Sequence, residues 1–129
     1  MVINVGSTEK GSLCEGYKTP GMFVQIKSHY DSAIKPAFFA IASAPGTHGK
    51  FEFIIKEAES TSWLWNLKKG DKVEMSPAMG KGFNMQELDL AGFAQEQKPL
   101  DVIMLATGTG VAPMRAAIES KAQGLHPTE

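Results

Sequence analysis

A glycine-rich stretch in the last quarter of the chain has the composition of a phosphate-binding turn. Thr107-Gly108-Thr109-Gly110 follows an apolar run and precedes a helical pattern that begins near Pro113. Glycines let the backbone approach an anion, and free amides at a helix start point toward it. Pro113 stands where the dinucleotide fingerprint has its third glycine, and proline suits the first helical position. The stretch predicts either nucleotide binding or a plain tight turn between a strand and a helix.

Three other groups of residues have side chains or backbones that suit a bound nucleotide. Ser60-Thr61-Ser62 precedes an apolar helical stripe. Such hydroxyls either bind a diphosphate or simply cap the helix. Phe38 and Phe39 are adjacent in a strand pattern, so one ring must face away from the core. That ring either stacks on a flat ligand or is covered by another part of the protein. The glycine-rich segment Met79–Phe83 indicates a flexible loop or a close approach of the backbone to a ligand.

Composition and charge argue against several other classes of function. The 129 residues carry a net charge of −1, so no basic surface for nucleic acid or for acidic membranes is indicated. The three histidines lack metal-ligand spacing, and no grouping of residues indicates a catalytic triad or a carboxylate pair. No apolar run reaches the roughly 20 residues of a membrane span. The single cysteine, Cys14, fits a reducing compartment, and we expect a soluble intracellular protein.

The elements that must position these residues change type near residue 99. Up to about residue 90, apolar residues alternate in short segments separated by glycine and proline, which predicts antiparallel strands. The run from Asp101 to Ala106 is continuously apolar, which is typical of a parallel strand buried on both faces. The predicted strands before it are Met22–Lys27, Pro36–Ser43, Phe51–Lys56 and Lys72–Ser76, and the predicted helices cover about 60–69 and 113–123.

Residues 101–129 have the pattern of the first βα unit of an α/β domain. A parallel sheet needs at least a second strand, and a lone apolar strand would promote aggregation. We therefore expect the remaining strands to lie outside this chain or to come from another polypeptide. In the second case the unpaired strand 102–106 would be an interface for oligomerisation.

The order of five segments resembles one family. The segments PGMFVQIK, AFFAIAS, FEFIIK, STSWLWNLKKGDKVEMSPAMGKGF and DVIMLATGTGVAPMRAAIES resemble the ferredoxin–NADP reductase superfamily, in particular its divergent plant- and alga-type branch. The resemblance implies a mainly β fold. An antiparallel six-stranded FAD-binding β-barrel with one short helix would span residues 1–98. The first βα unit of a Rossmann-like NAD(P) domain would span residues 99–129. Met1–Val5 would be the family's second strand, with the first missing.

The resemblance also implies a function. The protein would be an FAD-dependent oxidoreductase that transfers electrons between NAD(P)H and an acceptor that the sequence does not identify. The 129-residue chain would be inactive by itself. The resemblance implies a plastid location, with the cytoplasm as the alternative.

The family's flavin motif is arginine, any residue, tyrosine and serine, and it aligns with Ala37, Phe38, Phe39 and Ala40. Phe39 keeps a ring that stacks on the flavin, whereas the two alanines lose contacts to the diphosphate and to flavin N5. A charged hydrogen bond is worth about 1.5–3 kcal/mol, and Lys35 is a partial substitute as a point charge. The implied FAD-binding residues are Lys35, Phe38, Phe39, Ala40, Ser43, Ile55, Lys56, Thr61 and Ser62. The implied NAD(P)-binding residues are Thr107, Gly108, Thr109, Gly110 and Pro113.

The two alanines leave a second interpretation open. A barrel that has lost flavin would serve as a non-catalytic module in docking or regulation. Retention of a yellow flavin by the purified protein would separate the two interpretations.

Overall fold

The computed structural model describes residues 1–5, 7–8, 11–83 and 102–120. The strands are β1 (Val2–Asn4), β2 (Ser7–Thr8), β3 (Gly11–Ser12), β4 (Phe23–Ser28), β5 (Ala37–Ala40), β6 (Lys50–Glu52) and β7 (Val73–Met75). The helices are α1 (Ser62–Trp65) and α3 (Val111–Glu119), with 3₁₀ turns η1 (Leu13–Gly16), η2 (Glu59–Thr61) and η5 (Gly108–Gly110). None of the helices in the described ranges is long and apolar enough to cross a membrane.

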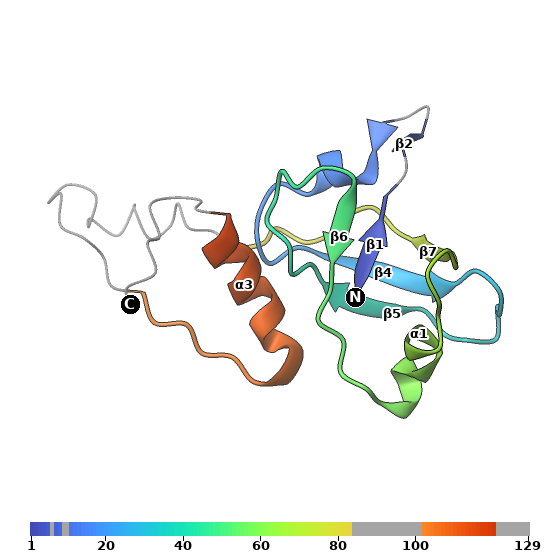
Figure 1. Cartoon of the computed structure of the whole chain (residues 1–129). Coiled ribbons are helices and arrows are strands. Elements are labelled where there is room, and N and C mark those ends of the chain that lie inside the picture. Colours follow the sequence, from blue (N-terminus) through green and yellow to red (C-terminus); the bar gives the residue numbers. More distant parts are fainter. Residues whose placement is uncertain (6, 9–10, 84–101, 121–129) are drawn as a thin grey trace, which may run out of the picture.

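The strands form small antiparallel sheets (Figure 1). One sheet has three strands in the order β5–β4–β7, and β1–β6 and β2–β3 are two-stranded. In the larger sheet Val24 lies opposite Phe39, and Ile26 lies opposite Met75. The amide of Ala42 donates to the carbonyl of Glu52 at 2.8 Å, which joins the end of β5 to β6. The sheets therefore meet where β5 ends.

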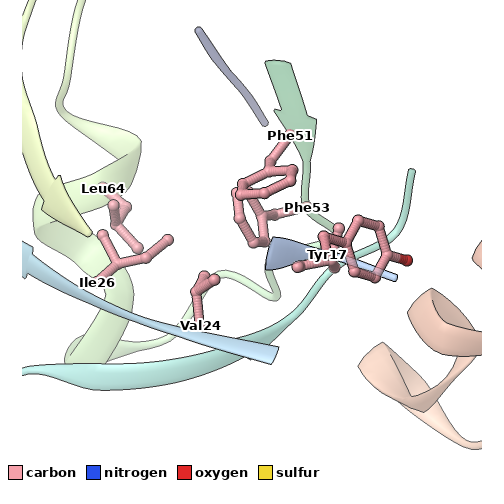
Figure 2. Close-up of a cluster of buried hydrophobic side chains, with 7 residues drawn as sticks. Tyr17, Val24, Ile26, Phe51, Phe53 and Leu64 are labelled. Carbon is pink, nitrogen blue, oxygen red and sulfur yellow. The ribbon is translucent and has the colours of Figure 1, made fainter. Parts of the chain in front are cut away.

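A single apolar cluster lies between the strands and α1 (Figure 2). Val24 and Ile26 alternate along β4 and are fully buried, as the period of two predicts. The rings of Tyr17 and Phe51 pack edge to face with centroids 5.7 Å apart, and those of Phe51 and Phe53 pack at 6.3 Å. The buried members are Tyr17, Val24, Ile26, Ile41, Phe51, Phe53 and Leu64.

Several elements predicted from the sequence are confirmed, although most are shorter. The predictions over 22–27, 36–43 and 72–76 correspond to β4, β5 and β7. The predicted helix over 60–69 is confirmed as η2 followed by α1, which ends at Trp65. The strand predicted from Phe51 to Lys56 ends at Glu52.

The prediction of a six-stranded barrel is wrong for the described residues. A closed barrel has no free edge, whereas β1 and β7 each lie at the end of a sheet with one side unpaired among the described strands. The chain also leaves regular pairing after Ala40 and after Glu52. Beyond those points isolated backbone contacts remain, such as the pair Met1 and Phe53, which exchange two hydrogen bonds of 2.8 Å each.

The predicted buried strand over 102–106 is also wrong. These residues are extended but belong to no sheet, and the side chains of Ile103 and Leu105 are each 85% exposed. A strand needs a neighbour to receive its backbone hydrogen bonds, and no described segment pairs with this one. The predicted helix that follows is confirmed as α3. The predicted domain boundary near residues 90–99 lies outside the described residues.

Candidate functional site

The outer face of β5 presents an exposed aromatic ring. Phe38 lies opposite Gln25 in β4 and is 62% exposed. Phe39 turns to the other face, packs against the core and meets Phe53 edge to face at 6.5 Å. Alternation along the strand therefore separates the two rings, and a flat ligand on the outer face would meet Phe38.

The ring of Phe38 packs against that of Phe23, and the Met79–Phe83 loop contacts Phe23. The rings of Phe38 and Phe23 pack edge to face with centroids 5.8 Å apart. Phe23 exchanges backbone hydrogen bonds with Met79 at 3.1 and 2.8 Å. A Cβ on Gly80 would lie 2.9 Å from the Phe23 ring, so only glycine lets the loop pack this closely.

The close backbone approach expected of this loop is made to the chain itself. The amide of Phe83 donates to the carbonyl of Pro20 at 2.7 Å. A Cβ on Gly82 would lie 2.6 Å from the same carbonyl oxygen. The glycines therefore seat the loop on the turn at Pro20 and Gly21.

The other residues on the β5 side offer few hydrogen-bond donors. Ala37 and Ala40 have none in their side chains, and Lys35 is an exposed cation. Ser43 is buried, and its hydroxyl oxygen accepts from the amide of Glu52 at 3.2 Å. The carbonyl of Ser43 accepts from the hydroxyl of Tyr17 at 2.8 Å, and burial raises the pKa of that phenol. Ser43 thus has an architectural role in this structure.

Thr61 and Ser62 use their hydroxyls in hydrogen bonds to the backbone of the residues that precede α1. The Thr61 hydroxyl donates toward the carbonyls of Lys56 at 2.7 Å and Ala58 at 3.2 Å, and it accepts from the amide of Ala58 at 3.0 Å. The Ser62 hydroxyl donates to the carbonyl of Glu59 at 2.8 Å. These hydroxyl protons are already used within the chain. Of the two hydroxyls, only that of Thr61 accepts a backbone amide from the described residues, at the start of η2.

The two neighbouring residues of the implied FAD set differ in exposure. Ile55 is half-buried against the core, and Lys56 is exposed. Lys56 therefore presents a solvated positive charge, whereas Ile55 contributes to packing.

The glycine loop before α3 is open to solvent. Gly108 has φ of +53°, in the left-handed region, and Gly110 donates to the carbonyl of Thr107 at 3.0 Å. Among the described residues, no heavy atom beyond the chain neighbours lies within 4 Å of a Cβ placed at Gly108 or Gly110. Thr107 and Thr109 are exposed, and Pro113 lies in the first turn of α3. The loop has room for a ligand against its backbone.

A group of charged side chains fastens α3 to β6. The guanidinium of Arg115 donates to the carboxylates of Glu52 and Glu119, each at 2.7 Å. Lys50 donates to the other oxygen of Glu52 at 3.0 Å. The hydrogen bonds from Lys50 and Arg115 hold the pKa of Glu52 below its usual range. The buried residues of α3 are the small ones, Ala112, Ala116 and Ala117.

The structure thus brings together some implied site residues and reassigns others. Phe38 and Lys35 are exposed, while Phe39 packs against the core and Ser43 is buried and hydrogen-bonded to the backbone. Sequence reasoning missed the pair Arg115–Glu52, which is separated by 63 positions and has no local pattern. Only the link from Arg115 to Glu119 had a local signal, the spacing of four on one helix.

Comparison with known proteins relates the chain to oxidoreductases that use nicotinamide nucleotides. It is similar to the NADPH-dependent diflavin oxidoreductase 1 of Candida albicans, with 30% identity over 101 residues, covering 70% of this chain and 15% of that protein. It is also similar to the F subunit of the Na(+)-translocating NADH-quinone reductase of Klebsiella pneumoniae, with 31% identity over 68 residues, covering 53% of this chain and 14% of that protein.

A third relative covers more of the chain. The fruit protein pKIWI502 of Actinidia deliciosa is 32% identical over 115 residues, which are 83% of this chain and 35% of that protein. The chain therefore spans about a third of the length of this relative and less of the other two. No protein-family model and no solved structure matches it.

Proposed function

We propose that the protein is an FAD-dependent oxidoreductase related to the ferredoxin–NADP reductase superfamily. It would transfer electrons between NAD(P)H and an acceptor. The observation that carries the proposal is the alignment of 70% of the chain with a NADPH-dependent diflavin oxidoreductase. The exposed ring of Phe38 and the open loop at Gly108–Gly110 support it.

The residues present fit the flavin ring better than the diphosphate. Phe38, backed by Phe23, offers an exposed aromatic wall for an isoalloxazine. On the diphosphate side Ala37 offers no donor. The hydroxyls of Thr61 and Ser62 already donate to backbone carbonyls. Lys35 and Lys56 would balance the phosphate charge as point charges. We therefore expect weak FAD binding by this chain.

A bound flavin supplies the redox chemistry, and the protein orients it and excludes competing reactions. Phe38 would hold the ring plane, and Thr107–Gly110 with Pro113 would receive the nicotinamide nucleotide. Arg115 would position that loop through its ion pair with Glu52.

A visible absorption spectrum after addition of FAD and desalting tests the proposal. We expect flavin absorbance that is partly retained after desalting, and an FAD affinity about fivefold lower for Phe38→Ala, because ring stacking is worth about 1 kcal/mol. Tyr30→Ala is a matched control, since that ring is 63% exposed but packs on His29 and not on Phe38 or Phe23. Equal FAD affinities of the Phe38 and Tyr30 variants would contradict the site.

A variant of the neighbouring ring shows which phenylalanine meets the ligand. Phe39→Ala should lower thermal stability because its ring packs on the core. Phe38→Ala should leave stability nearly unchanged. If Phe38→Ala lowered thermal stability and Phe39→Ala did not, Phe39 would be the outward ring and the ligand would lie on the opposite face of β5.

A second function, that of a non-catalytic docking or regulatory module, is favoured by Ala37, Ala40 and the capping role of Thr61. It predicts that neither this chain nor a longer form of the protein retains FAD or oxidises NAD(P)H.

A further inference from the structure

A cavity of about 760 Å³ lies between β1, in the sheet β1–β6, and the segment that leads into β7, in the sheet β5–β4–β7. One wall is β1 with Met1, and the other is the segment from Leu67 to Val73, which leads into β7. Leu64 and Leu67 contribute apolar side chains that also belong to the core or pack against it. The cavity therefore has an apolar base between two strand edges.

The backbone of β1 presents hydrogen-bonding groups to this cavity that no described strand pairs with. The Phe53 amide donates to the Met1 carbonyl, and the Val5 amide donates to the Gly49 carbonyl, both at 2.8 Å. These bonds show that the backbone N–H and C=O groups of Met1, Ile3 and Val5 point toward β6. Backbone groups alternate in an antiparallel strand, so those of Val2 and Asn4 point to the opposite edge.

The wall that leads into β7 also has backbone groups that point away from the neighbouring strand. The amide of Ser76 donates to the carbonyl of Gln25 at 2.9 Å, so the groups of Ser76 and Glu74 face β4. Alternation turns the backbone groups of Val73 and Met75 toward the unpaired edge. Val73 also lines the cavity.

The rim of the cavity is positively charged. Lys68, Lys69 and Lys72 are exposed, and no ion pair among the described residues involves them. The one carboxylate of the lining, Asp71, accepts the backbone amide of Lys68 at 2.8 Å. Three lysines thus face the cavity rim against a single carboxylate that is already engaged.

We propose that this groove binds an extended acidic segment of a partner protein by strand addition to β1. The partner backbone would receive and donate hydrogen bonds at Val2 and Asn4. Its apolar side chains would cover Leu67 and Val73, and its carboxylates would meet Lys68, Lys69 and Lys72. Backbone pairing gives affinity, and the lysines select an acidic sequence.

Titration of the full chain with a labelled peptide of alternating glutamate and valine tests the proposal by fluorescence anisotropy. We expect binding at least about tenfold tighter than that of a peptide with lysine in place of glutamate. Lys68→Glu/Lys69→Glu should weaken binding at least about tenfold. The control Lys18→Glu/Lys81→Glu changes net charge equally, outside the groove, and should leave binding within about twofold.

N-methylation of alternate peptide residues separates strand pairing from attraction between surface charges. It removes backbone donors but keeps every carboxylate, so we expect binding at least about fivefold weaker. Unchanged binding of the methylated peptide, or equal losses in the two charge variants, would overturn the proposal. So would dimerisation of the chain without peptide binding. A longer form of the protein that does not bind the peptide would assign the groove to the protein's own sequence and would also overturn it.

Discussion

The ion pair between Arg115 and Glu52 joins α3 to β6, and a double-mutant cycle measures its contribution. The relevant variants are Arg115→Met, Glu52→Gln and the double variant, because Gln keeps the shape of Glu and Met keeps the apolar stem of Arg while removing its charge. The two groups form a charge-assisted hydrogen bond of 2.7 Å, which favours a sizeable coupling. The Arg115 side chain is 39% exposed and that of Glu52 is 20% exposed, so solvent screens part of it. We expect a coupling free energy of about 1 kcal/mol.

Urea unfolding at neutral pH supplies the free energies of unfolding. A parallel cycle with Glu119→Gln is the internal control, since the pair Arg115–Glu119 is a surface pair at spacing four. Such pairs are worth about 0.3–0.5 kcal/mol. A coupling between Arg115 and Glu52 no larger than that of this control would refute the inference that the pair docks α3.

The same pair makes stability depend on pH. Lys50 and Arg115 lower the pKa of Glu52 in the folded state. A lowered carboxylate pKa contributes stability that is complete above the unfolded value of about 4.3. That contribution falls as the pH drops through the lowered folded-state value. The coupling free energy should therefore be present at pH 7 and absent near pH 2, and a coupling that persists under acid conditions would contradict the assignment.

Three further substitutions test the packing. Tyr17→Phe removes the donor to the buried Ser43 carbonyl, so we expect a loss of about 1–3 kcal/mol in urea unfolding, and a loss below 0.5 kcal/mol would argue against that bond. Gly82→Ala should lower the free energy of unfolding by at least about 1 kcal/mol more than Gly46→Ala. Both glycines have positive φ, but only a Cβ on Gly82 would meet a backbone atom, the Pro20 carbonyl oxygen at 2.6 Å. Equal losses would show that the turn relaxes. Trp63→Phe should change the unfolding free energy by less than about 1 kcal/mol, because the buried indole N–H has no acceptor among the described residues; a larger loss would reveal a partner for it.

Local patterns predicted the elements whose physical cause is local. Alternation from Met22 to Lys27 indicated β4, and the helical pattern that begins near Pro113 indicated α3. The adjacent rings of Phe38 and Phe39 required one to face outward, but the pattern did not say which. That choice depends on which face of β5 meets β4 and the core.

Local patterns did not predict which strands pair over long distances in the sequence. The run from Val102 to Ala106 has the composition of a buried strand, yet its backbone has no strand partner in the part of the chain that the structure describes. The expected barrel fails for the same reason at the free edges of β1 and β7. Hydrophobic composition makes burial favourable, but hydrogen bonding of a strand requires a neighbour that composition does not specify.

The sequence by itself determined the period of the apolar residues, the positions of the turns and the presence of an open glycine loop before a helix, because each depends on neighbouring residues alone. Tertiary structure decided that Phe38 is the outward ring and that Arg115 reaches Glu52. It also decided that lysines line a groove between two free strand edges. These features bring together residues far apart in the chain, and their geometry depends on how the sheets pack rather than on any local spacing.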